Sequence, residues 1–345
     1  MKLRPALKAI LFGVTVVALL VALRWTDFGT LRSVRDFAFD QFQRLAPRAY
    51  EPTPVRIIDI DERSLKTLGQ WPWPRTLVAK LSSRLNELGA AVVAFDVLFA
   101  EPDRLSPKNI MSEQSGVDPA IITGLRDNDA VLAAQFAQQP VVLGFATNVN
   151  SPTMPKVKAG FAFTGESPLL APPPLAGATP PLPVLEDAAA GIGDISMNAN
   201  ADSTVVRTIS LFRSDGKQLY PSLVMEALRV AQGASTYIIA NAPERAGSIA
   251  TARIGDFEVP TTAAGELQIY TNPERADRYV SASDVLSGDD AKLRPLIEGN
   301  IGWKNKLPRP SARLPPLANQ LSHRRVNHHP VIMRVGHIYI AIRTD

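Results

Sequence analysis

The feature that most limits the possible folds of this chain is a regular alternation of apolar and amphipathic segments between residues 55 and 147. "VRIIDI" (55–60), "AAVVAFDVLF" (90–99) and "PVVLGFAT" (140–147) are short apolar segments that predict strands. Between them, "RTLVAKLSSRLNELGA" (75–90) and "DNDAVLAAQFAQ" (127–138) predict helices, because their apolar residues recur every three or four positions. Strand, helix, strand, helix, strand predicts an α/β fold whose N-terminal half is a parallel sheet with right-handed crossovers.

The second half of the chain predicts a mixed sheet. "STVVRTISLFRSDGKQLY" (203–220) favours a hairpin that turns at Asp215-Gly216, and "PSLVMEALRVAQG" (221–233) favours a helix. "IATARIGDFEVP" (249–260) and "GELQIYTN" (265–272) add further strands. We therefore expect one large α/β body over residues 51–300, in which only the N-terminal half is purely parallel.

The N-terminus predicts a transmembrane anchor within residues 1–24. Three basic residues precede an uncharged run from Ala9 to Leu23, which approaches bilayer thickness if Lys8 snorkels. The alternative is a cleaved signal peptide, but no small-residue cleavage site follows Leu23. The basic end should stay in the cytoplasm, which places the chain in the inner membrane with its bulk extracytoplasmic. Arg32 and Arg35 weaken this orientation signal, because they lie on the exported side.

Residues 25–50 predict a juxtamembrane helix. In "LRSVRDFAFDQFQRL" (31–45) the apolar residues recur at spacings of mostly three and four. Pro47, Pro52 and Pro54 then end the helix.

Composition excludes several classes of function. The chain has no cysteine and four histidines, all between His323 and His337, so the body lacks Ser-His and Cys-His nucleophile pairs. The formal charge of +4 comes from the two ends of the chain, which argues against nucleic-acid binding. Nothing in the sequence calls for a cofactor, and we expect no metal site.

The corner "GQWPWPRTL" (69–77) is the stiffest stretch of the chain. Trp71 and Trp73 each precede a proline, which pushes both towards extended conformations, and Pro74 suits the first turn of the following helix. Two interpretations stay open: the indoles plug the strand-to-helix turn, or they contact a ligand.

Three acidic residues should gather at the carboxyl edge of the parallel sheet. Asp59 and Asp61 end the first strand and Asp96 follows the second, and open α/β sheets bind ligands at this edge. One interpretation is a carboxylate-held divalent cation, as in phosphatases that begin with D-x-D after a strand. The other is that the acids cap turns, with Asp61 pairing with Arg63 or Arg75.

Over roughly residues 31–300 the chain resembles the CHASE type 2 family, the extracellular sensory domain of bacterial adenylate and guanylate cyclases and histidine kinases. The resemblance rests on "VRIIDIDERSLKTLGQWPWPR", "LGAAVVAFDVLFAEPD", "YPSLVMEALR" and "SASDVLSG" in that order. The characteristic residues of the family fall here on Asp59, Asp61, Trp73, Pro74, Arg75, Asp96, Phe99, Pro102 and Asp103.

This resemblance implies an exported sensor without enzymatic activity of its own, followed by membrane helices and a cytoplasmic output module that this chain lacks. A homodimer is expected by the same analogy. The ligand, a small molecule or an envelope signal, is unidentified. The candidate ligand-binding residues are Asp59, Asp61, Trp73, Arg75, Asp96 and Asp103. Two rival functions stay open, a carboxylate-dependent metal hydrolase and a membrane-tethered interaction protein.

Residues 301–345 depart from the family pattern. The family continues there with an apolar strand and membrane helices, whereas this tail has eight Lys or Arg residues and no acid before Asp345. Its His pair, His328 and His329, lacks the spacing of a metal site. We expect an irregular basic tail, the product of a frameshift or a broken gene beginning near Asn300.

Overall fold

The computed structural model describes residues 12–17, 29–47, 55–114, 118–197, 206–242, 247–270, 275–298 and 338–342. The chain divides into two compact units. The first consists of Met1–Glu51 with Tyr270–Pro273, and the second of Pro52–Ile269 with Glu274–Asp345. The second unit contains every β-strand of the described residues.

In the first unit, helix α2 (Gly29–Leu45) confirms the helix expected within residues 25–50. Its Phe39 ring packs edge-on against Tyr270, with centroids 5.7 Å apart. The predicted membrane helix is not supported: among the described residues, no helix combines the length and the hydropathy that a bilayer crossing requires. Of the uncharged run, only residues 12–17 are described, as a short helical segment, and the others lie outside the described residues.

The main sheet of the second unit has seven strands among the described residues. They are β1 (Val55–Asp59), β2 (Ala90–Phe95), β3 (Val141–Thr147), β5 (Ala178–Thr179), β6 (Gly191–Asp194), β14 (Tyr279–Ser281) and β15 (Ile338–Ile342). Their spatial order is β14-β1-β15-β2-β3-β5, and β6 also pairs with β3. As predicted, this half contains parallel pairs, since β1 is parallel to β14 and β3 is parallel to β2 and β6.

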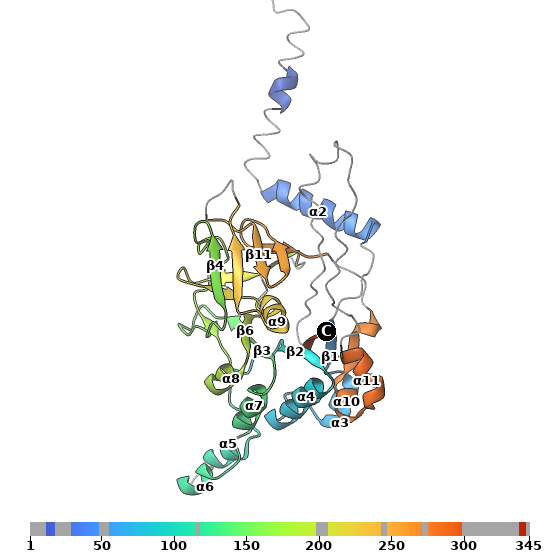
Figure 1. Ribbon diagram of the computed structural model, residues 1–345, viewed down its shortest axis with the longest axis vertical. Coiled ribbons are helices and arrows are strands. Elements are labelled where there is room, and N and C mark those ends of the chain that lie inside the picture. Colours follow the sequence, from blue (N-terminus) through green and yellow to red (C-terminus); the bar gives the residue numbers. More distant parts are fainter. Residues whose placement is uncertain are drawn as a thin grey trace, which may run out of the picture. The chain divides into compact units, whose positions relative to one another are not determined.

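Helices cover both faces of this sheet (Figure 1). On one face, α7 (Asn128–Phe136) packs against α4 (Arg75–Glu87) and α8 (Pro183–Ala188), whereas α9 (Leu223–Ala231) lies on the other face against β2, β3 and β6. The α4 stripe predicted from sequence is buried at Val78, Leu81 and Leu85. Because both faces are covered, β2 and β3 are almost continuously apolar.

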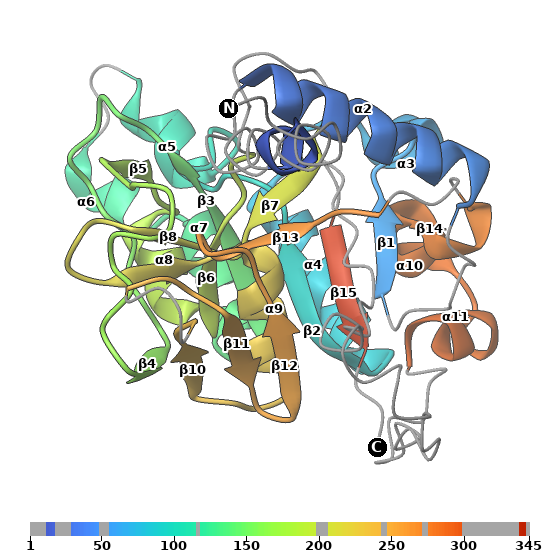
Figure 2. The same ribbon diagram turned by 90° about the horizontal axis from the view of Figure 1, so that it is seen from above.

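The structure corrects the predicted three-stranded unit at one place, because β15 lies between β1 and β2 (Figure 2). This strand comes from the tail that the sequence led us to expect as irregular. β15 runs antiparallel to both neighbours, with Ile338 opposite Ile58 and Phe95. β1 and β2 each have a row of backbone N–H and C=O groups facing this position. A strand between them gives these groups hydrogen-bond partners on both sides.

The second half is mixed, as predicted. Its four-stranded sheet consists of β4 (Gly160–Thr164), β10 (Thr236–Ala240), β11 (Thr251–Ile254) and β12 (Phe257–Pro260), in the order β12-β11-β10-β4. β4 and β10 are parallel, and the other pairs are antiparallel. The aromatic rings of Phe161, Phe212 and Tyr237 pack against one another in the core beneath this sheet.

Two smaller strand pairs and several short helices complete the second unit. The predicted hairpin is β8 (Phe212–Ser214) with β9 (Leu219–Pro221), and its turn contains Gly216 at φ 83°. The other pair is β7 (Thr208–Ser210) with β13 (Glu266–Gln268). The remaining helices are α3 (Glu62–Leu68), α5 (Pro107–Ser112), α6 (Pro119–Thr123), the 3-10 helix η1 (Ala276–Arg278), α10 (Ala282–Ser287) and α11 (Asp290–Ile297).

The position of β15 leads to a first prediction. Ile340 lies opposite Arg56 on β1 and Val93 on β2, in the middle of the strand. Ile340→Pro removes a backbone donor from the centre of the sheet, so we expect the free energy of unfolding to fall by about 1–3 kcal/mol in urea denaturation. Ile340→Val keeps the donor and should lie within about 1.5 kcal/mol of the parent protein. Equal stability of the proline variant and the parent would show that β15 does not complete the sheet.

Candidate functional site

The carboxyl ends of β1, β14 and β2 lie at one edge of the main sheet. β1 and β14 end side by side, with Asp59 paired to Ser281. Asp96 directly follows the last residue of β2. The structure therefore places Asp59, Asp61 and Asp96 at the same edge, as the sequence predicts.

β15 separates Asp59 from Asp96. Its first residue, Ile338, pairs with Ile58 on β1 and with Phe95 on β2. Asp59 and Asp96 directly follow these two residues, so they lie at the same height along the sheet on opposite sides of β15. Two strand spacings put their backbones about 10 Å apart. Both side chains are half-buried.

Asp61 fixes the turn between β1 and α3. It is the N-cap of α3, and its Oδ1 accepts hydrogen bonds from the Ser64 amide at 2.8 Å and the Ser281 hydroxyl at 3.0 Å. This is the turn-capping role that the sequence left as one alternative. Arg63, one of the two partners considered for Asp61, forms an ion pair with Asp284 of α10.

Three serine hydroxyls connect α3 to β14 and α10 at this edge. Ser64 Oγ lies 3.0 Å from Ser281 Oγ, and Ser281 Oγ lies 2.9 Å from Ser283 Oγ. The Ser283 amide donates to Ser64 Oγ at 3.0 Å, and the Arg63 Nε donates to Ser283 Oγ at 3.2 Å. Sequence analysis missed these serines, because the two segments are more than 200 residues apart in the chain. The network makes the three elements at the edge one cooperative unit.

The charge of Asp61 is stabilised by this network. Partial burial raises the pKa of Asp61, but the hydrogen bonds from Ser64 and Ser281 and the positive charge of Arg63 outweigh it, so the pKa lies below the ordinary value of 3.8. The carboxylate is therefore ionised over the whole physiological range.

Trp73 plugs the turn before α4. Its side chain is 2% exposed, and its indole Nε1 donates to the Gly69 carbonyl at 2.8 Å. Trp71 packs edge-on against it with ring centroids 5.7 Å apart, and the peptide bond between Trp71 and Pro72 is cis. Pro74 is the N-cap of α4, one residue before the helical position predicted for it. Of the two interpretations of this corner, the burial of Trp73 supports the plug.

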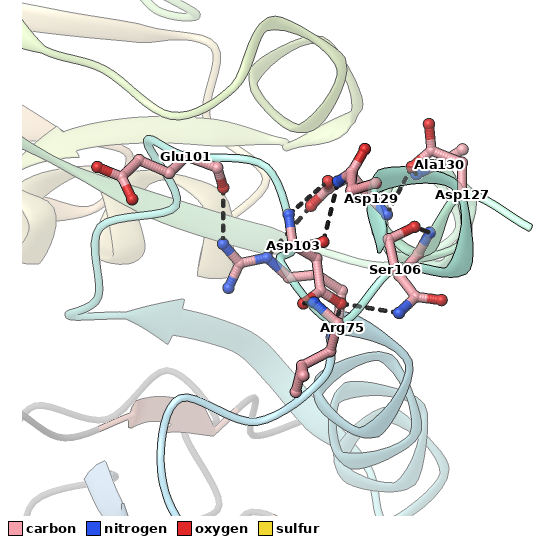
Figure 3. Close-up of polar contacts among 10 residues, drawn as sticks. Arg75, Glu101, Asp103, Ser106, Asp127, Asp129 and Ala130 are labelled. Atoms are coloured by element: carbon pink, nitrogen blue, oxygen red, sulfur yellow. Dashed lines mark hydrogen bonds and ion pairs between the residues drawn. The ribbon is translucent and has the colours of Figure 1, made fainter. Parts of the chain in front are cut away.

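Arg75 is the centre of a buried clamp (Figure 3). Its Nε donates to Asp129 Oδ1 at 3.2 Å, and its Nη2 donates to the Glu101 carbonyl at 3.1 Å. The guanidinium also lies over the Phe99 ring, 4.5 Å from its centroid. Planar stacking and forked hydrogen bonding are typical of a buried arginine. The clamp ties the start of α4 to the loop after β2 and to the start of α7.

Asp103 completes the clamp from the loop after β2. Its Oδ2 accepts from the Arg75 amide at 2.9 Å and from Asn128 Nδ2 at 2.8 Å, and its Oδ1 accepts from the Leu105 amide at 2.9 Å. Its own amide donates to Asp129 Oδ2 at 2.8 Å. Sequence analysis did not identify Asn128 or Asp129 as part of this cluster. Asp127, the N-cap of α7, is the local signal that could have placed them at the start of a helix.

The six candidate residues therefore fall into two groups. Asp59, Asp61 and Asp96 lie at the carboxyl edge and are partly accessible. Trp73, Arg75 and Asp103 are buried and hydrogen-bonded within the protein, so they support the fold around the edge. Among the described residues, no group of three His, Cys, Asp or Glu side chains could hold a metal ion. The four histidines lie outside the described residues.

Open α/β sheets commonly bind ligands at the carboxyl edge of their parallel strands, which is the edge where Asp59 and Asp96 lie. The family model of the CHASE2 domain matches residues 14–307, which is most of the 345-residue chain. The chain therefore belongs to the CHASE2 domain family, a family of extracellular sensory domains. No curated protein and no solved structure matches it.

The clamp leads to a second prediction. Arg75→Ala would leave Asp129 buried without its counter-charge, so we expect a loss of about 3–5 kcal/mol in the free energy of unfolding. Arg104→Ala, at an exposed arginine of the same loop, is the matched control and should change stability by less than about 0.5 kcal/mol. Urea denaturation measures both. If both variants changed the free energy of unfolding by less than about 0.5 kcal/mol, the stabilising role of the Arg75 clamp would be contradicted.

A third prediction concerns the pH dependence of Asp61. Because its pKa is lower in the folded protein, its contribution to stability is present above the ordinary value of 3.8 and is lost as the pH falls through the folded pKa. Asp61→Ala should cost about 0.5–2 kcal/mol at pH 7. Urea denaturation from pH 7 to pH 2.5 should show this difference shrinking below about pH 4. A difference that stays constant to pH 2.5 would rule out the ionised cap.

Proposed function

We propose that this chain is the extracytoplasmic ligand-sensing part of a membrane-bound signal-transduction protein. The observation that carries this proposal is the match to the CHASE2 family over residues 14–307. In this proposal the chain has no enzymatic activity. The signal passes to an output module, a nucleotide cyclase or a histidine kinase, outside these 345 residues.

We place the ligand at the carboxyl edge of the main sheet, between Asp59 and Asp96 and beside Asp61. Three carboxylates around one edge favour a molecule that carries hydrogen-bond donors or positive charge. In this proposal the ligand does not contact Trp73, Arg75 or Asp103. These buried residues support the site, because their hydrogen bonds hold α4 and the loop after β2 in place.

The proposed mechanism is a population shift. A ligand that prefers one packing of the edge changes the relative positions of α3, β14 and α10, which the serine network joins. We propose that this rearrangement alters the position of α2 and of an N-terminal membrane anchor. We propose that residues 9–23 form this anchor, with the basic end in the cytoplasm, because the run is uncharged and three basic residues precede it.

A ligand screen tests this function. The thermal denaturation of the full-length chain is measured with a panel of amines, amino acids, polyols and organic acids. We expect a cationic or donor-rich compound to raise Tm by several degrees, because binding to the folded state alone stabilises it. The double variant Asp59→Asn/Asp96→Asn should lose this shift while its Tm without ligand stays within a few degrees of the parent.

Asp187→Asn is the matched control for charge, since Asp187 is an exposed aspartate that pairs with Lys156 away from the edge. It should keep the ligand-induced shift. A shift that survives in the Asp59/Asp96 double variant would place the ligand elsewhere. If no compound in a broad panel stabilises the chain, a membrane-tethered interaction protein becomes the better explanation.

A further inference from the structure

Strand β4 (Gly160–Thr164) forms one edge of the four-stranded sheet in the second unit (Figure 1). The order of this sheet is β12-β11-β10-β4, so β4 pairs with β10 on one side. Among the described residues, no strand lies on its outer side. The outer side of an edge strand presents backbone N–H and C=O groups to which a further strand can bind.

The hydrogen bonds of β4 show which of its backbone groups face outwards. The Gly160 amide donates at 2.9 Å to the carbonyl of the residue before β10, and the Thr164 carbonyl accepts at 3.4 Å from the amide of the residue after β10. Both ends of β4, and Ala162 between them, therefore direct their backbone groups towards β10. Because successive residues of a strand alternate, the amides and carbonyls of Phe161 and Phe163 face away from the sheet.

Three other edges of the two larger sheets are protected against pairing, but β4 is not. β14 and β5, at the two ends of the main sheet, have three and two residues. β12, at the other end of the four-stranded sheet, contains Glu258 and ends in Pro260. Short strands, charges and prolines are the usual means of preventing contact at an edge. β4 has five residues, GFAFT, with neither a charge nor a proline.

The core of the second unit holds β4 in its extended conformation. The Phe161 ring stacks on Tyr237 of β10 with centroids 5.2 Å apart, and lies edge-on to Phe212 at 6.0 Å. Phe163 packs against the same core. A strand that is already ordered loses little conformational entropy when it binds a partner.

The exposed side chains of β4 leave room for large side chains on an added strand. Gly160, Ala162 and Thr164 are exposed, and all three are small. Ala162 lies beside Ile238 of β10, which is half-buried. A large apolar side chain on the added strand can lean over Ala162 and contact Ile238. The edge therefore fits an extended segment rich in β-branched or aromatic residues.

The same small side chains argue against a second copy of this chain as the occupant. A symmetric pair of β4 strands is antiparallel, and a pair centred on Ala162 would place Gly160 opposite Thr164. Cross-strand side-chain pairs are the main source of sheet stability, and these pairs would bury little apolar surface. The Phe161 and Phe163 rings would add little, because both already pack in the core of their own chain.

We propose that the outer edge of β4 binds a short extended segment of another protein, which adds a strand to the four-stranded sheet. The backbone of this segment hydrogen-bonds to Phe161 and Phe163, and one of its large apolar side chains lies over Ala162. In this mode of recognition, main-chain hydrogen bonds give affinity and alternate side chains give specificity. The edge is separate from the ligand site proposed beside Asp59 and Asp96.

Selection from a displayed library of random short peptides against the purified full-length chain tests this proposal. We expect the enriched peptides to contain β-branched or aromatic residues at alternate positions. Ala162→Lys should weaken their binding by about tenfold or more, because a charged side chain at an edge opposes pairing. Glu258→Lys is the matched control, since it places a lysine at an exposed position level with Ala162 but on β12, and should keep the affinity.

Residue-resolved hydrogen exchange shows where an enriched peptide binds. The amides of Phe161 and Phe163 should gain protection, whereas the Ala162 amide, which is already directed towards β10, should change less. The proposal is overturned if no peptide is enriched, if the peptides bind Ala162→Lys as tightly as the parent chain, or if they protect other amides instead.

Exchange of the chain alone at two protein concentrations tests the other occupant. Protection of the Phe161 and Phe163 amides that rises with protein concentration would assign this edge to a second copy and would overturn the proposal. Unchanged exchange of these amides is the expected result. The ligand screen involves no residue of β4, so failure of the edge and failure of the sensory function give different results.

Discussion

The buried guanidinium of Arg75 is the interaction on which the geometry of the candidate site depends. It joins Asp129, the Glu101 carbonyl and the Phe99 ring, and thereby fixes α4, α7 and the loop after β2 to one another. A buried arginine, here 8% exposed, needs its charge partner Asp129 in place, so the three elements hold one arrangement. The loop that begins at Asp96 is part of that arrangement.

Two further buried ion pairs hold the rest of the second unit together. Arg229 and Glu226 pair at 2.6 Å on α9, and Tyr237 of β10 donates to the same carboxylate at 2.7 Å. Burial and the negative charge of Glu226 raise the pKa of Tyr237 well above its ordinary value, so the phenol remains a donor. Arg213 pairs with Asp194 at the end of β6. Both pairs are almost fully buried, so removing one partner of either would leave an uncompensated charge in the core.

The sequence predicted those parts of the fold that local pattern determines. The parallel strand pair β2 and β3, the stripe of α4, helix α2 and the hairpin at Gly216 follow from spacing and turn residues within about 20 positions. It did not predict β15, because five residues in a basic, proline-rich tail show no periodicity and their partners lie more than 240 positions away. The clamp was missed for the same reason: Asp129 lies 54 residues from Arg75, and charged residues are normally expected on the surface.

Hydrogen exchange of the full-length chain, with and without a stabilising compound, tests the central claim that a ligand at the carboxyl edge acts on α2. The account predicts added protection of the amides around Asp59 to Ser64, after Asp96 and around Ser281 to Ser283, together with a changed exchange rate in α2. Protection confined to the four-stranded sheet of β4, β10, β11 and β12, with α2 unchanged, would contradict it.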